Sequence, residues 1–447
     1  MRGSRCMLQP KTFILEECGN VSRILHESLR YDYGTTEENP FFDELRSRLT
    51  RFHTDLSSSD QSPEELETSS KIVSELSTCI SLIERSHLGE FSWAFAECLK
   101  RIARRICVEK NLRSKFGDKN KVKDPIFHIS SEGGLASYKI VCESEILLAI
   151  GDRRIFNIVF PRSLKSHVLL HAVLAHEVGH AALSIPGHLI GNAKNAISDG
   201  ILTNRKTALQ WIKKLRPAVK RVDMDQLDSW LTEFLCDLFG LLLMGPSFAG
   251  ALLTLLAAKD PGGVGAPNQL GSHPPFHARL AVILQAVNIL KWTNDSRRLP
   301  KLVREANRAY WNRLLNFLPN RRLSQCRLFT NQQVTHSIRA IKKAIPSSEF
   351  FESVNQIPLN SLLNDLIDFV PPTGSRVLKN GDVSLERIDF RLIVHAGWLL
   401  WALKEQRDAG EKPINIKFFD TNRLCERGIL QQFAIDEMIA RSSPSNS

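Results

Sequence analysis

Two histidines and a glutamate lie within five consecutive residues near the middle of the chain, in the pattern His176-Glu177-Val-Gly-His180. Residues four apart share one face of a helix, so both imidazoles can bind one Zn²⁺ ion. Glu177 then lies beside the metal without binding it, close enough to deprotonate a water molecule held there. The surrounding residues, Val168 to Leu183, are otherwise apolar apart from one further histidine, His171. A buried helix with incidental histidines is the alternative, but burying Glu177 without a metal or a partner would be costly.

A zinc site needs a third protein ligand, and the spacing of the candidates separates several classes. A metzincin would have Gly at position 183 and His at position 186, where this chain has Leu183 and Pro186. His188 is one remaining candidate. The better candidate is Glu233, which lies four residues before Asp237 on an otherwise apolar segment and therefore shares a helix face with it. One carboxylate can bind zinc while the other orients a ligating histidine; the alternative is a helix-terminal charge and a surface aspartate.

Cys236 lies near the face that carries Glu233, but a cysteine on an apolar helix usually belongs to the core. A third segment, Ser272-His273-Pro-Pro-Phe-His-Ala-Arg279, combines a proline-led helix start with basic side chains. Proline at a helix entry fixes the preceding loop, so His273 would be held rigidly. A positioned His273 or Arg279 can stabilise the oxyanion that forms when water attacks a carbonyl. An ordinary helix N-terminus with a surface arginine is the alternative.

Together the three segments resemble the gluzincin group of zinc metallopeptidases that includes HtpX-like proteases and CAAX prenyl endopeptidases. The family pattern is AHExxH, then ExxxD, then HPxxxxR, and it occurs here in that order within about residues 155–290. The resemblance implies one zinc ion bound by His176, His180 and Glu233, with Glu177 as general base, Asp237 supporting a zinc-binding histidine, and His273 and Arg279 shaping the site. The regulatory ImmA/IrrE-like metallopeptidases also carry an HExGH helix, but the HPP block argues against that type.

The family's best-known members carry several membrane helices, and one segment here is long enough to be considered as one. Leu238 to Ala258 has no charged residue over 21 positions. Glycines and Gly245-Pro246 interrupt it, however, which favours a buried pair of helices. A single crossing would also place Glu233 and His273 on opposite sides of a bilayer. We therefore expect no membrane span and a soluble member of the family.

The elements that must position these residues are predicted from periodicity. Short apolar runs predict strands at Ile126–Ile129, Tyr138–Cys142, Ile146–Ile150 and Ile155–Phe160, and helical patterns occupy most of the remainder. We expect an α+β fold, mostly α-helical, in which a zincin-like metallopeptidase domain with a small β-sheet is flanked by helical regions. The predicted regions are 1–125 (helical), 126–293 (zincin-like) and 294–447 (helical and basic).

The 447 residues carry a formal net charge of +11 and nine cysteines without a CxxC pair. Scattered cysteines argue against a disulfide framework and indicate a reducing, cytoplasmic compartment. Residues 291–343 contain thirteen Lys and Arg opposed only by Asp295 and Glu305, and residues 100–123 contain ten opposed by two acids. Tyr310, Trp311, Phe317 and Phe329 are interleaved with the first stretch. Residues 291–343 are therefore a candidate surface for an acidic protein partner or a nucleic acid.

These observations favour a zinc-dependent endopeptidase that hydrolyses peptide bonds in a protein or peptide substrate. The alternative from another class is a nucleic-acid- or partner-binding regulatory protein in which the zinc domain is structural or regulatory. A degenerate peptidase fold without metal is a third hypothesis, which the complete set of expected catalytic positions disfavours.

Overall fold

The computed structural model divides the chain into two compact units. Unit one comprises residues 1–93 and 107–165, and unit two comprises residues 94–106 and 166–447. The structure describes residues 10–28, 40–83, 92–107, 125–132, 139–142, 154–185, 190–214, 219–221, 223–259, 273–292, 299–316, 328–351, 356–373, 375–377, 383–385, 387–408 and 413–442. The units group residues differently from the three regions expected from the sequence, and those regions stay a prediction.

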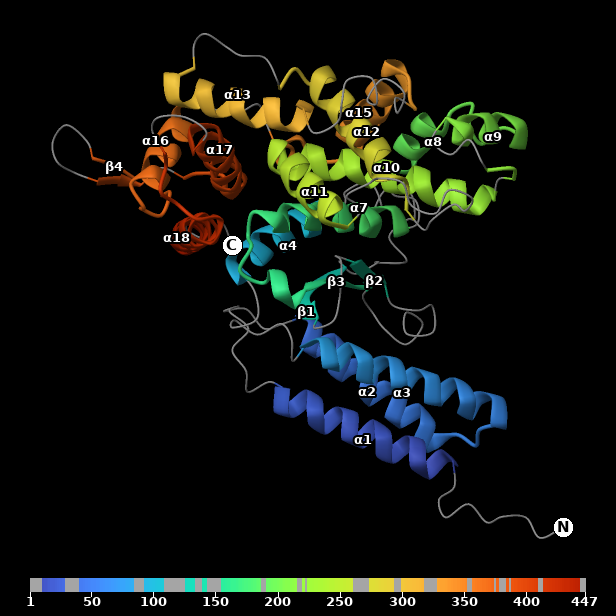
Figure 1. Ribbon diagram of the computed structural model, residues 1–447. Coiled ribbons are helices and arrows are strands. Elements are labelled where there is room, and N and C mark those ends of the chain that lie inside the picture. Colours follow the sequence, from blue (N-terminus) through green and yellow to red (C-terminus); the bar gives the residue numbers. More distant parts are fainter. Residues whose placement is uncertain are drawn as a thin grey trace. The chain divides into compact units, whose positions relative to one another are not determined.

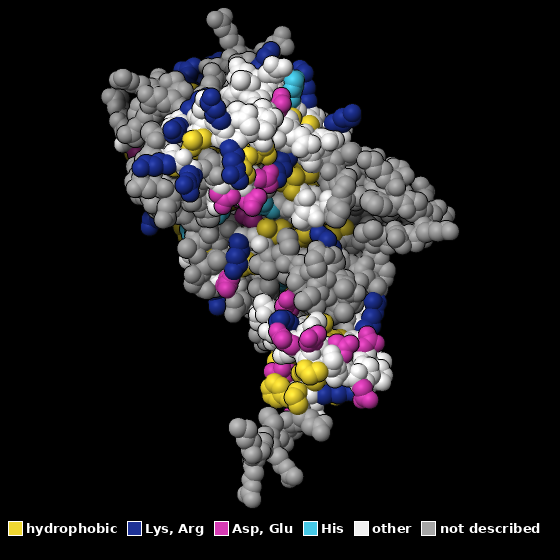
Figure 2. Space-filling model, turned by 90° about the vertical axis from the view of Figure 1, so that its right-hand side faces the viewer, with side chains coloured by type: hydrophobic (Ala, Val, Ile, Leu, Met, Phe, Trp, Pro, Cys, Tyr) yellow, Lys and Arg dark blue, Asp and Glu magenta, His cyan; other side chains and the backbone are white. Residues whose placement is uncertain are grey.

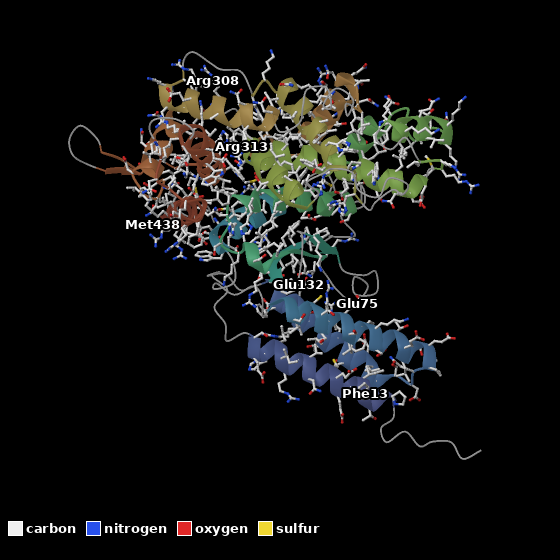
Figure 3. The ribbon with its side chains drawn as sticks, viewed as in Figure 1. Phe13, Glu75, Glu132, Arg308, Arg313 and Met438 are labelled. Atoms are coloured by element: carbon white, nitrogen blue, oxygen red, sulfur yellow. The ribbon has the colours of Figure 1, made fainter. Side chains whose placement is uncertain are left out.

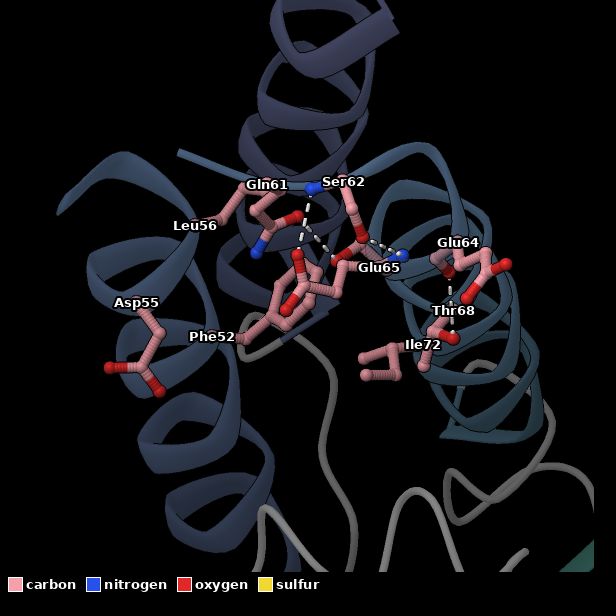
Figure 4. A pocket seen from close by; sticks show the side chains of 10 residues that line it. Phe52, Asp55, Leu56, Gln61, Ser62, Glu64, Glu65, Thr68 and Ile72 are labelled. Carbon is pink, nitrogen blue, oxygen red and sulfur yellow. Dashed lines mark hydrogen bonds between the residues drawn. The ribbon is translucent and has the colours of Figure 1, made fainter. Parts of the chain in front are cut away.

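Unit one contains three helices, α1 (Pro10–Ser28), α2 (Pro40–Ser58) and α3 (Pro63–Ile83). Each begins at a proline, whose fixed φ suits the first turn of a helix and whose missing N–H costs nothing there. Ser62 and Glu65 form a reciprocal cap before α3: the Ser62 N–H donates to Glu65 Oε2 at 2.7 Å, and the Glu65 N–H donates to Ser62 Oγ at 3.3 Å (Figure 4). Apolar side chains of all three helices form one buried cluster, which includes Ile14, Leu45, Leu49, Leu76 and Ile80.

Unit one also contains a three-stranded sheet built from β1 (Ile126–Glu132), β2 (Lys139–Cys142) and β3 (Ile155–Pro161). The strand order is β1-β3-β2, with β1 parallel and β2 antiparallel to β3. Three of the four predicted strands are thus confirmed, and the fourth, residues 146–150, lies outside the described residues. Every residue of β3 is buried, including Asn157 within its otherwise apolar run.

Unit two is built mainly from helices. Several of its helices, from the middle of the chain, surround the His176-Glu177 segment (Figure 1). The 3₁₀ turn η3 (Leu170–Val173) leads into α7 (Leu174–Ser184), which packs along α10 (Met224–Met244). The apolar segment that carries His176 therefore begins with a 3₁₀ turn before it becomes an α-helix. The neighbouring helices are α8 (Gly191–Ser198), α9 (Arg205–Lys213), α11 (Pro246–Lys259) and α12 (Phe276–Ile289).

The long apolar segment forms the predicted pair of buried helices. Helix α10 ends at Met244, and Gly245 adopts φ +64°, a left-handed conformation that suits glycine, before α11 begins at Pro246. The Phe351 ring fills the space beside Gly245, where an added Cβ would lie 2.3 Å from a ring atom. Within the described ranges, no helix combines the length and the apolar character that a membrane crossing requires.

The remaining helices of unit two pack around the same core. They are most of α4 (Trp93–Cys107), α13 (Lys301–Asn316), α15 (Asn331–Ala344), α16 (Gln356–Ile367), α17 (Phe390–Asp408) and α18 (Phe418–Ser442), with a hairpin of β4 (Ser375–Val377) and β5 (Val383–Leu385). The Leu169 N–H donates to Asn422 Oδ1 at 2.9 Å, and Trp398 Nε1 donates to the Leu169 carbonyl at 3.1 Å. Side chains of α17 and α18 therefore hold the backbone just before η3 and α7.

Helices make up most of the described residues and strands few, so the α+β, mostly α-helical class is confirmed.

Candidate metal centre

Helix α7 approaches α10 closely at Gly179, the glycine inside the His-Glu-x-x-His pattern. A Cβ at this position would lie 3.2 Å from the Cα and the Sγ of Cys236. That contact is tighter than ordinary van der Waals packing, so a larger residue would push the two helices apart. Cys236 is fully buried, as predicted for a core cysteine. The close approach brings the histidines of one helix within reach of the carboxylate of the other.

His176 and His180 of α7 converge on Glu233 of α10. The two Nε2 atoms are 3.1 Å apart. Glu233 Oε2 lies 3.4 Å from His176 Nε2, and Glu233 Oε1 lies 3.2 Å from His180 Nε2. Among the described residues, these three form a group that can hold a metal ion, since their ligand atoms all lie within 4.8 Å of one another.

Two further charged residues, Asp237 and Arg279, contact the cluster of His176, His180 and Glu233. His176 Nδ1 lies 2.9 Å from Asp237 Oδ1, so the Nδ1–H donates to the carboxylate and Nε2 is turned toward Glu233. Arg279 of α12 donates to both oxygens of Asp237, from Nε to Oδ2 at 2.7 Å and from Nη2 to Oδ1 at 2.6 Å. Its Nη1 also lies 3.5 Å from Glu233 Oε2. One bidentate arginine thus links the two carboxylates of α10.

The buried charges shift one another's pKa values. Burial alone would lower the pKa of His176, but the Glu233 charge and the hydrogen bond to Asp237 raise it to about 10. Burial would raise the pKa of Glu233, but His176, His180 and Arg279 outweigh that effect and lower it. The pKa of Asp237 is lowered in the same way, chiefly by the charge of Arg279 against the cost of burial. The site therefore holds the carboxylates of Glu233 and Asp237 ionised.

Glu177 and His273 lie around this cluster with very different exposure. Glu177 directly follows the ligand-like His176 and is 7% exposed. His273 precedes α12, its side chain is 61% exposed, and its Nε2 lies 3.9 Å from Glu233 Oε1. Partial burial lowers the pKa of His273. Arg279, in contrast, is 5% exposed and its guanidinium is occupied by Asp237 and Glu233.

The structure therefore brings together every predicted site residue that it describes: His176, Glu177, His180, Glu233, Asp237, His273 and Arg279. His188, the other candidate ligand, lies outside the described residues. What the sequence analysis missed is the partner of Arg279, which was predicted to stabilise an oxyanion and here binds Asp237. A usable signal was present, because Arg279 is the only charged residue in the apolar segment from Phe276 to Leu290. A lone charge on a buried helix implies a buried partner.

In the described part of the basic stretch at residues 291–343, one arginine is paired with an acidic side chain of the same unit. Arg313 of α13 forms an ion pair with Glu405 of α17, and Arg407 of α17 lies 3.3 Å from Glu305 of α13. Figure 3 shows Arg313 between these helices. Tyr310, Trp311 and Phe329 are buried, so they are not available to stack on bases; Phe317 lies outside the described residues.

Lys and Arg side chains are also numerous on the face drawn in Figure 2, toward which α8 and α9 lie. Helix α9 contributes exposed Arg205, Lys206 and Lys213 to the surface of unit two. In the sequence this helix is inconspicuous, because its charges are too few to form a run. Binding of an acidic partner or a nucleic acid stays a prediction.

Comparison with known proteins adds no relative: no family model matches the chain, and neither the curated proteins nor the solved structures contain a significant match. The geometry of the centre is thus the basis for a functional assignment.

Proposed function

We propose that this chain is a zinc-dependent endopeptidase of the gluzincin type, acting on a protein or peptide substrate. The observation that carries the proposal is the convergence of His176, His180 and Glu233 at one point, with Glu177 in the turn between the two histidines. Two imidazoles and one carboxylate leave a fourth position for water or substrate, which is the pattern of catalytic rather than structural zinc sites.

The donor set fits zinc in geometry and in chemistry. With metal–ligand distances of about 2.0–2.1 Å, the edges of a tetrahedron around zinc are about 3.3 Å long. The separations between the ligand atoms here are 3.1, 3.2 and 3.4 Å. Glu233 Oε2 is buried and has no hydrogen-bond partner among the described residues, although such atoms are normally satisfied. A cation bound between these groups would satisfy that oxygen.

The roles of the chain's own residues follow from their positions. The chemistry that a zinc ion supplies at such a site is Lewis-acid polarisation of the scissile carbonyl and activation of a water molecule. Glu177 accepts the proton of the attacking water and passes it to the departing amine, a task that suits a carboxylate beside the ligands. His176 and His180 hold the ion from one helix face, and Glu233 holds it from the other helix.

The buried pair Asp237 and Arg279 has a different role from the exposed His273. Asp237 fixes the tautomer and the orientation of His176, and Arg279 holds Asp237 in place by two hydrogen bonds. Because Arg279 is buried and occupied, His273 is the better placed of the two predicted oxyanion groups. Its exposed imidazole lies beside Glu233 on the solvent side of the metal centre, where it can contact a bound substrate.

Replacing Glu177 with Gln tests the proposal, because the amide preserves shape and cannot accept a proton. We expect the variant to retain one zinc ion per chain, measured by elemental mass spectrometry. Cleavage of a library of quenched fluorogenic peptides should fall by about 10²–10⁴-fold.

Glu64→Gln, the same change on an exposed position of α3, serves as the matched control and should cleave as the unaltered chain does. Undiminished cleavage by Glu177→Gln would refute the mechanism. Absence of bound zinc in the purified, zinc-supplemented protein would refute the metal assignment.

A further inference from the structure

Exposed large apolar side chains are concentrated around α18, far along the chain from the metal ligands. Eight such side chains are exposed among the described residues, and six lie on α18 or on the loop that precedes β4. These six are Phe369, Val370, Phe419, Leu430, Met438 and Ile439. Single exposed apolar residues are ordinary, but a concentration of this kind marks an interaction surface. Met438, 67% exposed, lies at the outer edge of α18 (Figure 3).

Three of the four exposed large apolar residues of α18 share one face with arginines, and Ile439 lies on another side of the helix. With 3.6 residues per turn, Phe419, Leu430 and Met438 fall within an arc of about 100°. Exposed Arg423, Arg427 and Arg441 project from the same arc, and the Arg423 guanidinium lies 5.8 Å from the centre of the Phe419 ring. The opposite face, which includes Asn422, Cys425 and Ile429, is buried. The outer face of α18 is therefore both apolar and basic.

The acidic residues of α18 do little to neutralise this arc. Glu437 forms an ion pair with Arg101 of α4, and Asp436 pairs with Arg387 at 2.7 Å. Asp420 and Glu426 lie at the margins of the arc and are partly buried. The exposed centre of the face thus carries a net positive charge.

A second exposed apolar element packs on another side of the same helix, at Gly428 and Gln432. The loop from Phe369 to Thr373 packs on α18: an added Cβ at Gly428 would lie 2.6 Å from the Pro372 carbonyl oxygen, and Gln432 Nε2 donates to the Thr373 carbonyl at 2.9 Å. Phe369 has φ +59°, a conformation that is rare for a bulky residue, and its side chain is 53% exposed. Strained backbone of this kind persists where the surroundings enforce it, often at functional surfaces.

We propose that the outer face of α18 docks the protein onto an anionic lipid membrane surface. Helices that lie in the membrane interface combine apolar side chains with Lys and Arg that contact lipid headgroups. The apolar residues from Phe419 to Met438 are spread along about 28 Å of a convex helix, which suits a flat, extended partner. A second copy of the chain fits less well, because it would place arginines against arginines.

Vesicle flotation of the full chain tests this proposal. We expect binding to phosphatidylcholine vesicles that contain about 30% phosphatidylserine, and not to vesicles of phosphatidylcholine alone, because the arginines need anionic headgroups. Raising the salt concentration should weaken binding, since it screens exposed charges.

Two charge-reversal variants distinguish vesicle binding through the α18 face from binding through the overall positive charge of the chain. Arg423→Glu/Arg427→Glu should weaken vesicle binding by about 30-fold or more, since each arginine near an anionic surface contributes roughly a factor of five. Lys206→Glu/Lys213→Glu in α9 makes the same change in net charge on a helix without an exposed large apolar side chain, and should bind as the unaltered chain does. Equal losses in both variants would overturn the proposal, because net charge alone would then explain binding.

Leu430→Ser/Met438→Ser tests the apolar component and should also weaken binding, with circular dichroism to verify that the helix content is unchanged. Unchanged vesicle affinity in this variant, or no vesicle binding by the unaltered chain, overturns the proposal. Self-association, or binding of poly-glutamate without vesicle binding, would assign the face to a protein partner instead and likewise overturn it.

Discussion

Two buried histidines of unit two show how differently the same side chain can be used. His176 of α7 is 4% exposed and lies among Glu233, Asp237 and Arg279, and its pKa is raised to about 10. His395 of α17 is 0% exposed and packs edge-on against the rings of Tyr310 and Phe351. Within the part of the chain that the structure describes, neither ring nitrogen of His395 has a hydrogen-bond partner, and burial lowers its pKa to about 3.

The difference teaches that burial alone does not make a histidine a ligand. Around His176 the carboxylates offset the cost of removing a charge from water, and they aim one ring nitrogen at a common point. Around His395 nothing compensates the polar atoms, so the imidazole stays neutral and serves as core. The three predictions below test this contrast, from the largest expected effect to the smallest.

Replacing either histidine with leucine should affect metal binding in one case and leave it unchanged in the other. His176→Leu removes one of the converging ligands, and we expect metal affinity to fall by about 100-fold or more, since loss of a supporting residue alone costs 10–100-fold. His395→Leu should leave the metal content at one ion per chain. Competition against a zinc chelator measures both. Equal affinities in the two variants would contradict the assignment of His176.

Arg279→Met tests whether the charges of the metal centre form one network. The substitution leaves the fully buried Asp237 carboxylate without its bidentate partner, and we expect the free energy of unfolding to fall by about 3–5 kcal/mol. Adding Asp237→Asn should recover part of that loss, because an amide carries no buried charge. Urea unfolding of the metal-free chain measures both variants. A cost below about 1 kcal/mol for Arg279→Met would show that the pair contributes little.

His395→Leu should change how stability depends on pH. The pKa of His395 is about 3 in the folded chain and 6.5 in its unfolded reference, so the unfolded chain binds a proton that the folded chain does not. Stability is therefore lost as the pH falls from about 6.5 toward 3, by about 1.4 kcal/mol per pH unit. Between pH 7 and pH 4.5 the titration of His395 should lower the free energy of unfolding of the unaltered chain by about 2–3 kcal/mol. The leucine variant should not show this loss. Urea unfolding at both pH values measures this difference. An equal change in the free energy of unfolding in the two chains would contradict the prediction.

Much of the centre follows from sequence because helix periodicity is local. The spacing of His176 and His180 places them on one face of a helix, and the spacing of Glu233 and Asp237 does the same on another. The strand at Ile155–Phe160 and the break at Gly245-Pro246 are equally local, since short apolar runs and Gly-Pro pairs act over a few residues. His395 has no such pattern around it, and sequence spacing does not reveal which rings surround it.

By itself, the sequence determined which side chains share a helix face and which segments are too apolar to be exposed. Only the tertiary structure decided that Gly179 meets Cys236, that Glu233 therefore reaches both histidines, and that Arg279 binds Asp237. It also decided that Arg313 of the basic stretch pairs with Glu405. The physical reason is range: periodicity acts over a few residues of one helix, whereas a metal centre depends on how closely helices distant in the sequence can pack.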